Sequence, residues 1–504
     1  MAEPPPPPSQ SPPASAAPSN ESASPGQWAL GPIAWLEHYL PDAFVFALIA
    51  TGLVFGAGLF STGGRMAPLL AAWGKGFSSL LAFTLQMAMV IITGHVVASA
   101  PGVSRLLLRP SSLPRSPRSA VAFVTVLALL SSWLNWGFSL VFSALLARAV
   151  ATRFAERGEK VDYRALAAAS FLGLGSIWAQ GLSGSAALQM ATPGAIPDSL
   201  AHILRCGRET CGAAGTVPQT VPGAALLPLS YTIFLWQSLV SVLVETVVVT
   251  GTMTWLMPTG GRARSAQDLG IALPTHEATG DALPVASRPG EFLEHRPFLS
   301  SLIVVLGIGY LAVHFAAAPR VLEAITLNTV ILILLLLGMA LHRTPARLQQ
   351  AFAAATPAVW GVILQFPFYG GIAGLLSATQ LNERIASVFV QLSTRATLPP
   401  LIAVYSALLG IFVPSGGSKW LIEAPYVLAA AHRLQVHLGW MVATYDLGEA
   451  LANLLQPFWM LPTLAILGLK ARQVMGFTVL VFLVLLPVVL GLTWGLGRTL
   501  PYPL

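Results

Sequence analysis

The segment PSGGSK at residues 414–419 places polar, flexible and charged side chains between long apolar stretches of the chain. Glycines permit close approach of the backbone, and serines supply hydroxyl groups at little steric cost. Lys419 adds a full positive charge, and an ionisable group inside an apolar segment is a functional candidate by default. A helix broken here would also direct backbone N–H groups toward a ligand. The segment therefore predicts a site for a carboxylate or another small anion, although Lys419 could instead extend to lipid headgroups.

Three other apolar stretches are interrupted in a comparable way. Asn-Trp-Gly lies at residues 135–137, QGLSGS lies at 180–185, and an asparagine and a glutamine interrupt the stretch at 448–459. Irregular backbone at membrane depth is tolerated only inside protein or beside a cavity. We therefore expect the interruptions to meet around one pocket, in which tryptophans would contact an apolar chain. The predicted substrate-binding residues are Asn135, Trp136, Gly137, Ser183, Gly184, Ser185, Ser415, Gly416, Gly417, Ser418, Lys419, Trp420, Asn453 and Gln456.

Three further ionisable residues are candidates for binding a proton or another cation. Glu423 follows Lys419 by four residues, so the two would share one helix face and either neutralise each other or form part of a proton-coupled switch. Glu449 lies one turn deeper than Asp446, which we expect near the interface at the start of its helix. His95 is a third candidate because histidine titrates near neutral pH, although a lone histidine near a helix end is more often a packing residue.

The sequence lacks the motifs of the common enzyme classes. It contains no G-x-x-x-x-G-K-[ST] loop for ATP, no HExxH and no Cys/His cluster. Cys206 and Cys211 could form a disulfide or remain two free thiols, and two thiols alone make a poor metal site. We expect no catalytic residue, no metal and no cofactor, so any energy that the protein uses must come from a gradient or a partner.

The composition places these residues in a membrane protein. Of the 504 residues, 55% are hydrophobic and only 9% are charged, and the mean hydropathy is +0.71, whereas soluble domains are about one quarter charged. The net charge of +7 comes from basic residues in short loops beside apolar stretches, where orientation signals belong. The expected surroundings are therefore a lipid bilayer crossed several times, and nucleic acid is not an expected partner.

The basic loops predict two stretches that enter the membrane without crossing it. Residues 101–118 and 148–164 are both rich in arginine, which favours a cytoplasmic position for both. Because only one apolar stretch separates them, we predict a re-entrant hairpin over 119–147 with its tip at Asn-Trp-Gly. When the remaining basic loops are assigned to sides of the membrane in the same way, a second hairpin is predicted over 397–431, and the chain has nine membrane spans besides the two hairpins.

The order of spans, hairpin and broken helix occurs twice along the chain and, in this topology, in opposite orientations. Inverted repeats with broken helices are typical of secondary transporters. We therefore expect an all-α polytopic membrane protein, built as an inverted-repeat secondary transporter with two re-entrant hairpins and broken helices. Its predicted units are a disordered Pro/Ser-rich tail at 1–30, a first transmembrane repeat at 31–257, a cytoplasmic linker loop at 258–296 and a second repeat at 297–504.

Six blocks carry a resemblance to a known family. They are LLAFTLQMAMVIITGH (80–95), LNWGFSLVFSALLAR (134–148), GLSGSAALQMATPG (181–194), LQFPFYGGIAG (364–374), VPSGGSKW (413–420) and NLLQPFWMLPTLAILGL (453–469). In this order they resemble the bacterial short-chain fatty acid transporter family, of the AtoE type. More distantly, the layout is similar to the ion-transporter superfamily with paired re-entrant hairpins. The resemblance implies uptake of short-chain fatty acids such as acetoacetate or butyrate across a bacterial inner membrane.

The leading hypothesis is a secondary transporter that moves a short-chain monocarboxylate by alternating access, in symport with H⁺ or Na⁺. A monoanion fits because only Lys419 provides a cation within a predicted polar break. An integral membrane enzyme acting on a lipid-linked substrate is the alternative, and a passive channel is a third reading. A homodimer is among the assemblies that the sequence allows.

Overall fold

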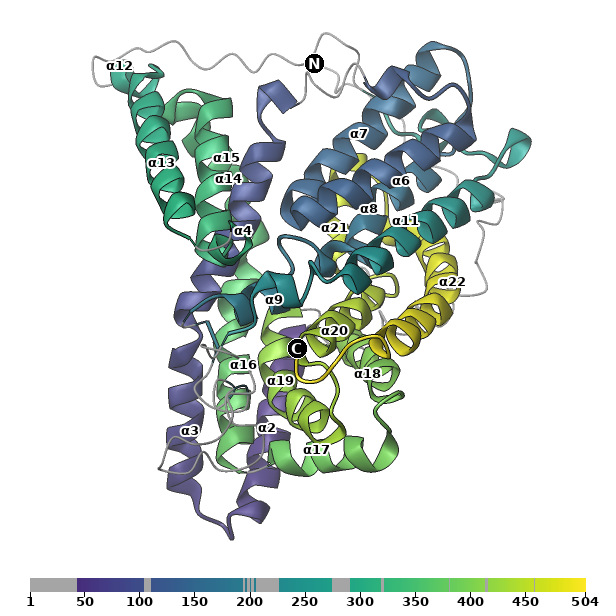
Figure 1. The fold of residues 1–504 in the computed structure, drawn as a ribbon. Coiled ribbons are helices and arrows are strands. Elements are labelled where there is room, and N and C mark those ends of the chain that lie inside the picture. Colours follow the sequence, from purple (N-terminus) through teal and green to yellow (C-terminus); the bar gives the residue numbers. More distant parts are fainter. Residues whose placement is uncertain are drawn as a thin grey trace, which may run out of the picture.

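The structure is a computed structural model in which all regular secondary structure of the described residues is helical (Figure 1). It describes residues 43–103, 110–193, 195–196, 200, 204, 226–273, 291–318, 321–379, 381–412, 416–456 and 458–504. The tail at 1–30 and both cysteines lie outside these residues, so what we predicted for them stays a prediction.

The α-helices described here are, in chain order, α2 (Ala43–Ser61), α3 (Met66–Ser79), α4 (Leu81–Ala98), α6 (Pro117–Leu134), α7 (Trp136–Glu156), α8 (Tyr163–Ser176), α9 (Ser185–Ala191), α11 (Trp236–Leu256), α12 (Glu291–Glu294), α13 (Phe298–Ala317), α14 (Leu327–His342), α15 (Pro345–Ala355), α16 (Trp360–Ala378), α17 (Leu381–Leu392), α18 (Leu398–Phe412), α19 (Gly416–Leu434), α20 (Leu438–Ala452), α21 (Leu461–Leu467) and α22 (Ala471–Gly497). Two 3₁₀ turns matter for the site, η2 (Trp178–Gln180) and η8 (Phe458–Met460).

Many of these helices are long and apolar enough to cross a membrane. Among the described residues seven helical segments qualify by length and composition, or eight if the bent pair Tyr163–Ser176 and Trp178–Ala191 forms one span. Helices α3 and α4 count together as one such segment. The expected all-α polytopic membrane protein is therefore confirmed. The nine spans, the re-entry of the hairpins and the division into repeats stay predictions.

The first predicted hairpin forms two helices that reverse at Asn135. The backbone of Asn135 is extended, and its side-chain Oδ1 accepts a hydrogen bond of 2.7 Å from the N–H of Phe138, which caps the start of α7. Serines join the two arms, since Ser131 Oγ donates to Ser139 Oγ at 2.9 Å and Ser139 Oγ donates to the carbonyl of Ala128 at 3.0 Å. Such small hydroxyl side chains let apolar helices approach closely and hydrogen-bond across their contact.

The second predicted hairpin likewise consists of two helices, α18 and α19, on either side of residues 413–415, which lie outside the described residues. The first arm of each hairpin packs against the helix that follows the hairpin, α6 against α8 and α18 against α20. Both contacts depend on a glycine. A methyl group on Gly173 would collide with the carbonyl oxygen of Ala128, and one on Gly448 would collide with that of Ala403.

All of these helices except α12 and α17 are placed here in two groups in space (Figure 1). Helices α2, α3, α4 and α13 to α16 line one side of the molecule, and we call them the long-helix region. Helices α6 to α9, α11 and α18 to α22, with the turns η2 and η8, form the other side, and we call them the broken-helix region. The two regions meet where α4 packs against α7 and where α16 packs against α19.

Candidate functional site

A small cavity lies at the junction of the two regions. Its long-helix wall comes from α4 and α16, and its other wall comes from the interruptions in the broken-helix region. The lining residues are Met87, Ile91, Trp136, Leu174, Trp178, Ser185, Val362, Phe366, Gly416, Gly417, Asn453 and Trp459. The cavity is thus bounded by residues from all four interruptions of the predicted site.

The wall from the long-helix region is wholly apolar. Met87 and Ile91 lie one turn apart on α4, and Val362 and Phe366 lie one turn apart on α16. The ring of Phe366 stacks on that of Phe83 with centroids 5.8 Å apart, which holds α16 against α4. This surface suits an alkyl chain because it offers no hydrogen-bonding side chain.

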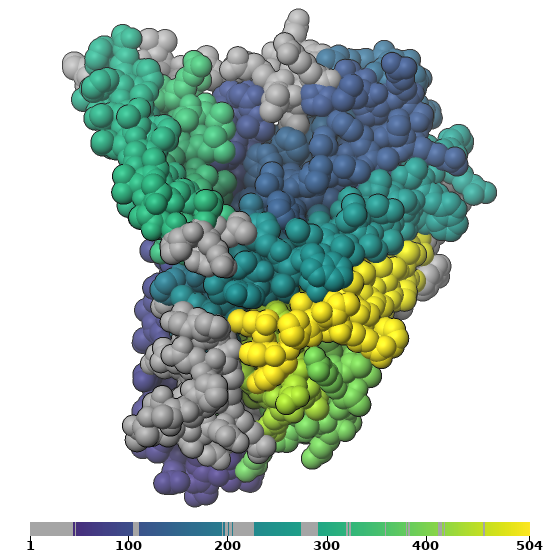
Figure 2. Space-filling model, in the orientation of Figure 1, coloured from purple at the N-terminus to yellow at the C-terminus, as the bar shows by residue number. Residues whose placement is uncertain are grey.

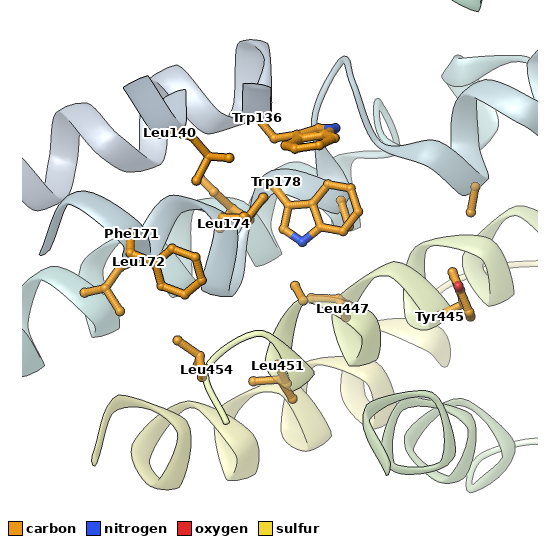
Figure 3. Close-up of a cluster of buried hydrophobic side chains, with 14 of the residues drawn as sticks. Trp136, Leu140, Phe171, Leu172, Leu174, Trp178, Tyr445, Leu447, Leu451 and Leu454 are labelled. Carbon is orange, nitrogen blue, oxygen red and sulfur yellow. The ribbon is translucent and has the colours of Figure 1, made fainter. Parts of the chain in front are cut away.

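Three tryptophans meet at the opposite wall. The ring of Trp136 lies edge-on to Trp178 at 6.1 Å and to Trp459 at 5.2 Å between centroids. Figure 3 shows Trp136 and Trp178 beside each other, with Leu447, Leu451 and Leu454 across from them. The backbone N–H of Trp136 donates to Ser183 Oγ at 2.9 Å, so the tip of the first hairpin is tied to the break after η2. The aromatic wall is therefore fixed by both packing and a hydrogen bond.

The start of α19 brings backbone to the cavity surface. A methyl group on Gly416 would lie 2.9 Å from Cη2 of Trp178, and one on Gly417 would lie 3.0 Å from Cβ of Ser185. Only glycine allows this approach without displacing Trp178 and Ser185. Gln189 Nε2 on α9 donates to the carbonyl of Gly417 at 3.1 Å. The second hairpin and the first broken helix are therefore held together at the cavity.

Few polar groups face this apolar space. Ser185 and Asn453 line it, and Asn453 Nδ2 donates to the carbonyl of Leu174 at 3.0 Å while Gln456 Nε2 donates to Asn453 Oδ1 at 2.9 Å. The indole N–H groups of Trp136 and Trp178 are buried and have no hydrogen-bond partner among the described residues. Buried donors without a partner cost free energy, so they are candidates to bind a ligand that supplies acceptor oxygens.

A fully buried charged cluster lies directly behind Gly416. Lys419 and Glu449 form a close ion pair, and Lys419 Nζ also donates to the carbonyl and the hydroxyl of Ser406 at 2.6 and 3.0 Å. Glu423 Oε1 lies 3.8 Å from Lys419 Nζ, and the ring of Tyr445 lies 5.0 Å from the same atom. The cluster is separated from the cavity by little more than one residue, because a methyl group on Gly416 would lie 3.3 Å from Cγ of Glu449.

The carboxyl groups in this cluster outnumber its cation. Lys419, Glu423, Glu449 and Asp446 are each at most 2% exposed, so one lysine faces three buried carboxyls. Neither oxygen of Glu423 accepts a hydrogen bond from a described residue, and one oxygen of Asp446 is also without a partner. Uncompensated charge is strongly disfavoured in such surroundings. A bound proton or another cation is therefore required if the cluster is to be close to neutral.

The structure distributes the predicted residues between the cavity and the layer behind it. Trp136, Ser185, Gly416, Gly417 and Asn453 line the cavity. Asn135, Gly137, Ser183, Gly184 and Gln456 lie within the interruptions and support the lining. Ser415 and the side chain of Ser418 lie outside the described residues.

Other predicted residues lie away from the cavity surface. Lys419 is buried in its ion pair, and Trp420 packs on the ring of Tyr445 at 4.7 Å between centroids, so neither belongs to the lining. His95 is in the last turn of α4, apart from the charged cluster. The interfacial position expected for Asp446 is wrong, because this residue is buried in the middle of α20.

Sequence reasoning missed Trp178 and the partnership of Lys419 with Glu449. Trp178 precedes the break at Gly181, and a tryptophan beside a predicted break was the available signal. The ion pair joins α19 to α20, so no local spacing could have revealed it.

Comparisons with known proteins agree with this architecture. Residues 31–495 match the family model described as short chain fatty acid transporter. A protein of Escherichia coli (strain K12), provisionally named a short-chain fatty acid transporter, is 35% identical over 446 residues, which cover 88% of this chain and 94% of that protein. A protein of Haemophilus influenzae (strain ATCC 51907 / DSM 11121 / KW20 / Rd) with the same name is 33% identical over 451 residues, covering 89% and 95%.

Two solved structures share the fold at low sequence identity. The crystal structure of the Alcanivorax borkumensis YdaH transporter, which has an unusual topology, matches with a TM-score of 0.54 and 16% identity, covering 91% of this chain and 100% of that one. Neisseria gonorrhoeae MtrF, described with a class of antimetabolite efflux pumps, matches with a TM-score of 0.56 and 14% identity, covering 93% and 98%. These two likenesses bear on the fold alone.

Proposed function

We propose a substrate and a mechanism from one premise, that this chain belongs to the short chain fatty acid transporter family and is therefore a membrane transporter and not an enzyme. The proposed substrate is a short-chain monocarboxylate such as acetoacetate or butyrate. The proposed process is uptake across a bacterial inner membrane by alternating access, coupled to a cation.

The observation that carries the substrate class is the composition of the cavity wall. One side is aliphatic and aromatic, and the other presents neutral donors, namely Ser185, the indoles of Trp136 and Trp178, and the start of α19. The first amides of a helix have no partner within it and attract negative charge. A carboxylate would meet these donors, and a short alkyl chain would lie on the aliphatic side. A dicarboxylate would place a second negative charge in the cavity, and no described lining residue carries a positive charge to offset it.

Lys419 acts on the substrate indirectly in this proposal. Its ammonium group is occupied by Glu449 and Ser406, so it fixes the position of α19 against α18 and α20. Through this contact it holds Gly416 at the cavity surface. The carboxylate then binds to neutral donors in front of a buried charged cluster, and Lys419 is a positioning residue.

We propose the proton as the coupling cation in this cluster. Three carboxyls surround one lysine, and the ammonium of Lys419 already occupies the position between Glu423 and Glu449 that a metal cation would need. A proton can neutralise Glu423 without displacing the lysine, whereas Na⁺ would need several oxygen ligands around it. Among the earlier coupling candidates, this reasoning favours Glu423 and Glu449 over His95.

The two regions of the molecule give alternating access a physical basis. The cavity is enclosed by apolar helices on one side and by interrupted helices on the other. A movement of the broken-helix region against the long-helix region would expose the cavity to one side of the membrane and then to the other. The repeated order of hairpin and broken helix supports two related states of this kind.

The experiment that tests the proposal measures uptake of labelled butyrate and acetoacetate by the full chain in proteoliposomes. Sodium is varied at fixed pH, and pH is then varied at fixed sodium. We expect saturable uptake that follows the pH gradient and not the sodium gradient. Sodium-driven uptake would overturn the choice of the proton, a linear and unsaturable flux would indicate a channel, and the absence of flux with either acid would overturn the substrate.

A further inference from the structure

A further buried carboxyl, Glu245, lies outside the charged cluster and has no role in the function proposed above. Glu245 is the only charged residue of α11, and it is 1% exposed. Its neighbours Leu243 and Val247 are each 64% exposed on the outer face of the same helix. Figure 2 shows α11 crossing this surface of the molecule beside α22. Glu245 therefore points inward from a peripheral helix, where an ionisable side chain is costly and needs a reason.

The partner of Glu245 is a neutral amide. Gln180, also 1% exposed, donates from Nε2 to Glu245 Oε1 at 2.6 Å, and its own Oε1 is buried without a partner among the described residues. This separation is shorter than the usual range of N–H···O bonds and lies within the range of O–H···O bonds. The amide nitrogen and oxygen of a glutamine can exchange places by rotation of the end of its side chain. The same pair can therefore serve an ionised carboxylate, with the amide donating, or a carboxylic acid, with the acid donating to the amide oxygen.

Beside Gln180, helix α20 packs against η2 and carries Tyr445, Asp446 and Glu449 of the charged cluster. The helices packed against α11 bring no other titratable or charged group to Glu245. They are α6, α8 and α22, and the titratable side chains in them and at their caps lie in terminal turns, remote from the middle of α11. These side chains are Arg118 on α6, Asp162, Tyr163 and Arg164 at the start of α8, and Lys470, Arg472 and Arg498 at the ends of α22. No described cation forms an ion pair with Glu245. A carboxylate in this position would be a buried charge without compensation, so the carboxyl is neutral in this conformation.

Gln180 connects this carboxyl to the substrate cavity. It is the last residue of η2, in the break that bends the pair Tyr163–Ser176 and Trp178–Ala191 by 47°. Trp178, at the start of the same turn, lines the cavity, and Gly416 touches its ring. A change in the hydrogen bond of Gln180 therefore acts on the segment that forms the aromatic wall.

We propose that Glu245 is a second proton-binding site, and that Gln180 senses its protonation state by turning its amide. In the acid form the amide is turned so that Gln180 Oε1 faces Glu245 and accepts its O–H. Loss of the proton reverses the hydrogen bond, so that Gln180 Nε2 donates to the carboxylate, and it places an uncompensated charge behind the break. That charge is tolerated only when the break opens and admits water, so release of the proton favours a different arrangement of the aromatic wall. The effect on transport rests on the proposed function, whereas the proton site itself does not.

The first experiment detects the proton without any substrate. Infrared spectra of the purified full chain are recorded across a pH series, and the spectrum of the Glu245→Gln variant is subtracted from that of the native chain at each pH. We expect a carboxylic acid C=O band, absent from Glu245→Gln, that disappears as the pH rises. Gln180→Met should shift that band, because it removes the hydrogen-bond partner. A band that keeps its intensity across the series, or no band attributable to Glu245, would overturn the proton site.

The second experiment measures the pH profile of butyrate exchange in proteoliposomes at a fixed concentration of the anion. Glutamine resembles the protonated acid, so we expect Glu245→Gln to keep at high pH the exchange rate that the native chain shows at low pH. Gln237→Met is the matched control, because Gln237 lies two turns earlier on α11, is equally buried and donates to Thr499 Oγ1 at 2.9 Å. Its profile should keep the native shape.

A native profile in Glu245→Gln would overturn the link to transport, as would an equally flattened profile in Gln237→Met. If the native chain moved no butyrate, the proposed function would fail while the infrared result still decided the proton site.

Discussion

The broken-helix region has a first half (α6 to α9 and α11) and a second half (α18 to α22), and each half contains a buried carboxyl near the cavity. The two carboxyls have partners of different charge. Behind Trp178, Glu245 faces the neutral amide of Gln180. Behind Gly416, Glu449 faces the cation Lys419, with Glu423 nearby. Both sites are buried. Glu449 lies next to the lining residue Gly416, whereas Glu245 is linked to the lining through Gln180, which shares the turn η2 with Trp178. They differ in the charge of the partner.

This difference sets what each carboxyl can do. A carboxylate beside a lysine is held ionised, and removal of either partner leaves a buried charge uncompensated. A carboxyl beside an amide can accept or lose a proton while keeping one hydrogen bond, because the amide supplies both a donor and an acceptor. The Lys419–Glu449 pair is therefore suited to hold α19 in place, and Glu423 is left as the carboxyl of that cluster that can take up a proton. Glu245 is suited to change its charge without breaking an ion pair.

Replacement of Lys419 should break this comparison most severely. Lys419→Met removes the only described cation that faces three buried carboxyls, so we expect loss of uptake and a destabilisation of about 3 kcal/mol or more. The measurements are butyrate uptake and the thermal unfolding midpoint of the purified protein. The double variant with Glu449→Gln should recover part of the stability and none of the uptake. Normal uptake by Lys419→Met would show that the cluster has no part in transport.

Neutralising the two carboxyls should give unequal losses of stability. Glu449→Gln leaves Lys419 buried with Glu423, at 3.8 Å, as its remaining ion-pair partner, so we expect a cost near the lower end of the roughly 3–5 kcal/mol for a broken buried pair. Glu245→Gln breaks no ion pair and retains a side chain that can hydrogen-bond to Gln180, so its cost should stay below about 1 kcal/mol. Thermal unfolding of both variants, measured side by side, tests this order. Equal losses would mean that the partner's charge is not what distinguishes the two sites.

A methyl group at Gly416 should disturb the thin layer between Glu449 and the cavity. It would lie 2.9 Å from Cη2 of Trp178 and 3.3 Å from Cγ of Glu449, and such overpacking typically costs about 1–3 kcal/mol. We expect Gly416→Ala to lower uptake about tenfold, which corresponds to roughly 1.4 kcal/mol. Gly251→Ala on α11 is the control, because a methyl group there meets no atom within 4 Å. It should leave uptake unchanged and add up to about 1 kcal/mol of helix stability.

The comparison also shows how far local sequence patterns reach. The four interruptions were visible in the sequence as small and polar residues within apolar stretches, and helix breaks or hairpin tips occur at or beside them. Glu423 was recognised as a neighbour of Lys419 because four residues separate them on one helix. The membrane character followed from composition, because a chain with so few charged residues must expose an apolar surface, which is stable only in lipid.

What the sequence did not reveal depends on contacts between distant segments. Glu449 pairs with Lys419 only because α20 packs against α19, and Lys419 therefore lies behind the cavity instead of lining it. Asp446 was assigned to an interface because a charge early in a helix is usually exposed, yet α18 and α22 cover α20. Glu245 was overlooked, although a single acid within an otherwise apolar helix is a signal that sequence alone supplies.

An exposed ion pair provides the smallest effect and a reference for both buried sites. Asp268 lies in the loop after α11, where it accepts hydrogen bonds of 2.9 Å from the N–H and the hydroxyl of Ser265 and pairs with Lys160 at 3.3 Å. The backbone hydrogen bond from Ser265 is the main reason that the pKa of Asp268 is lowered.

The sign of the pH effect follows from that lowered pKa. The contribution of Asp268 to stability is present above its unfolded pKa, which is about 3.9, and is lost as the pH falls through the folded value. Because the pair is exposed, Asp268→Asn should change stability by less than about 1 kcal/mol. It should leave the pH profile of butyrate exchange near neutrality unaltered, since Asp268 stays ionised throughout that range. A flattened profile in Asp268→Asn would place the pH dependence at the loop surface, and neither buried carboxyl would then be needed to explain it.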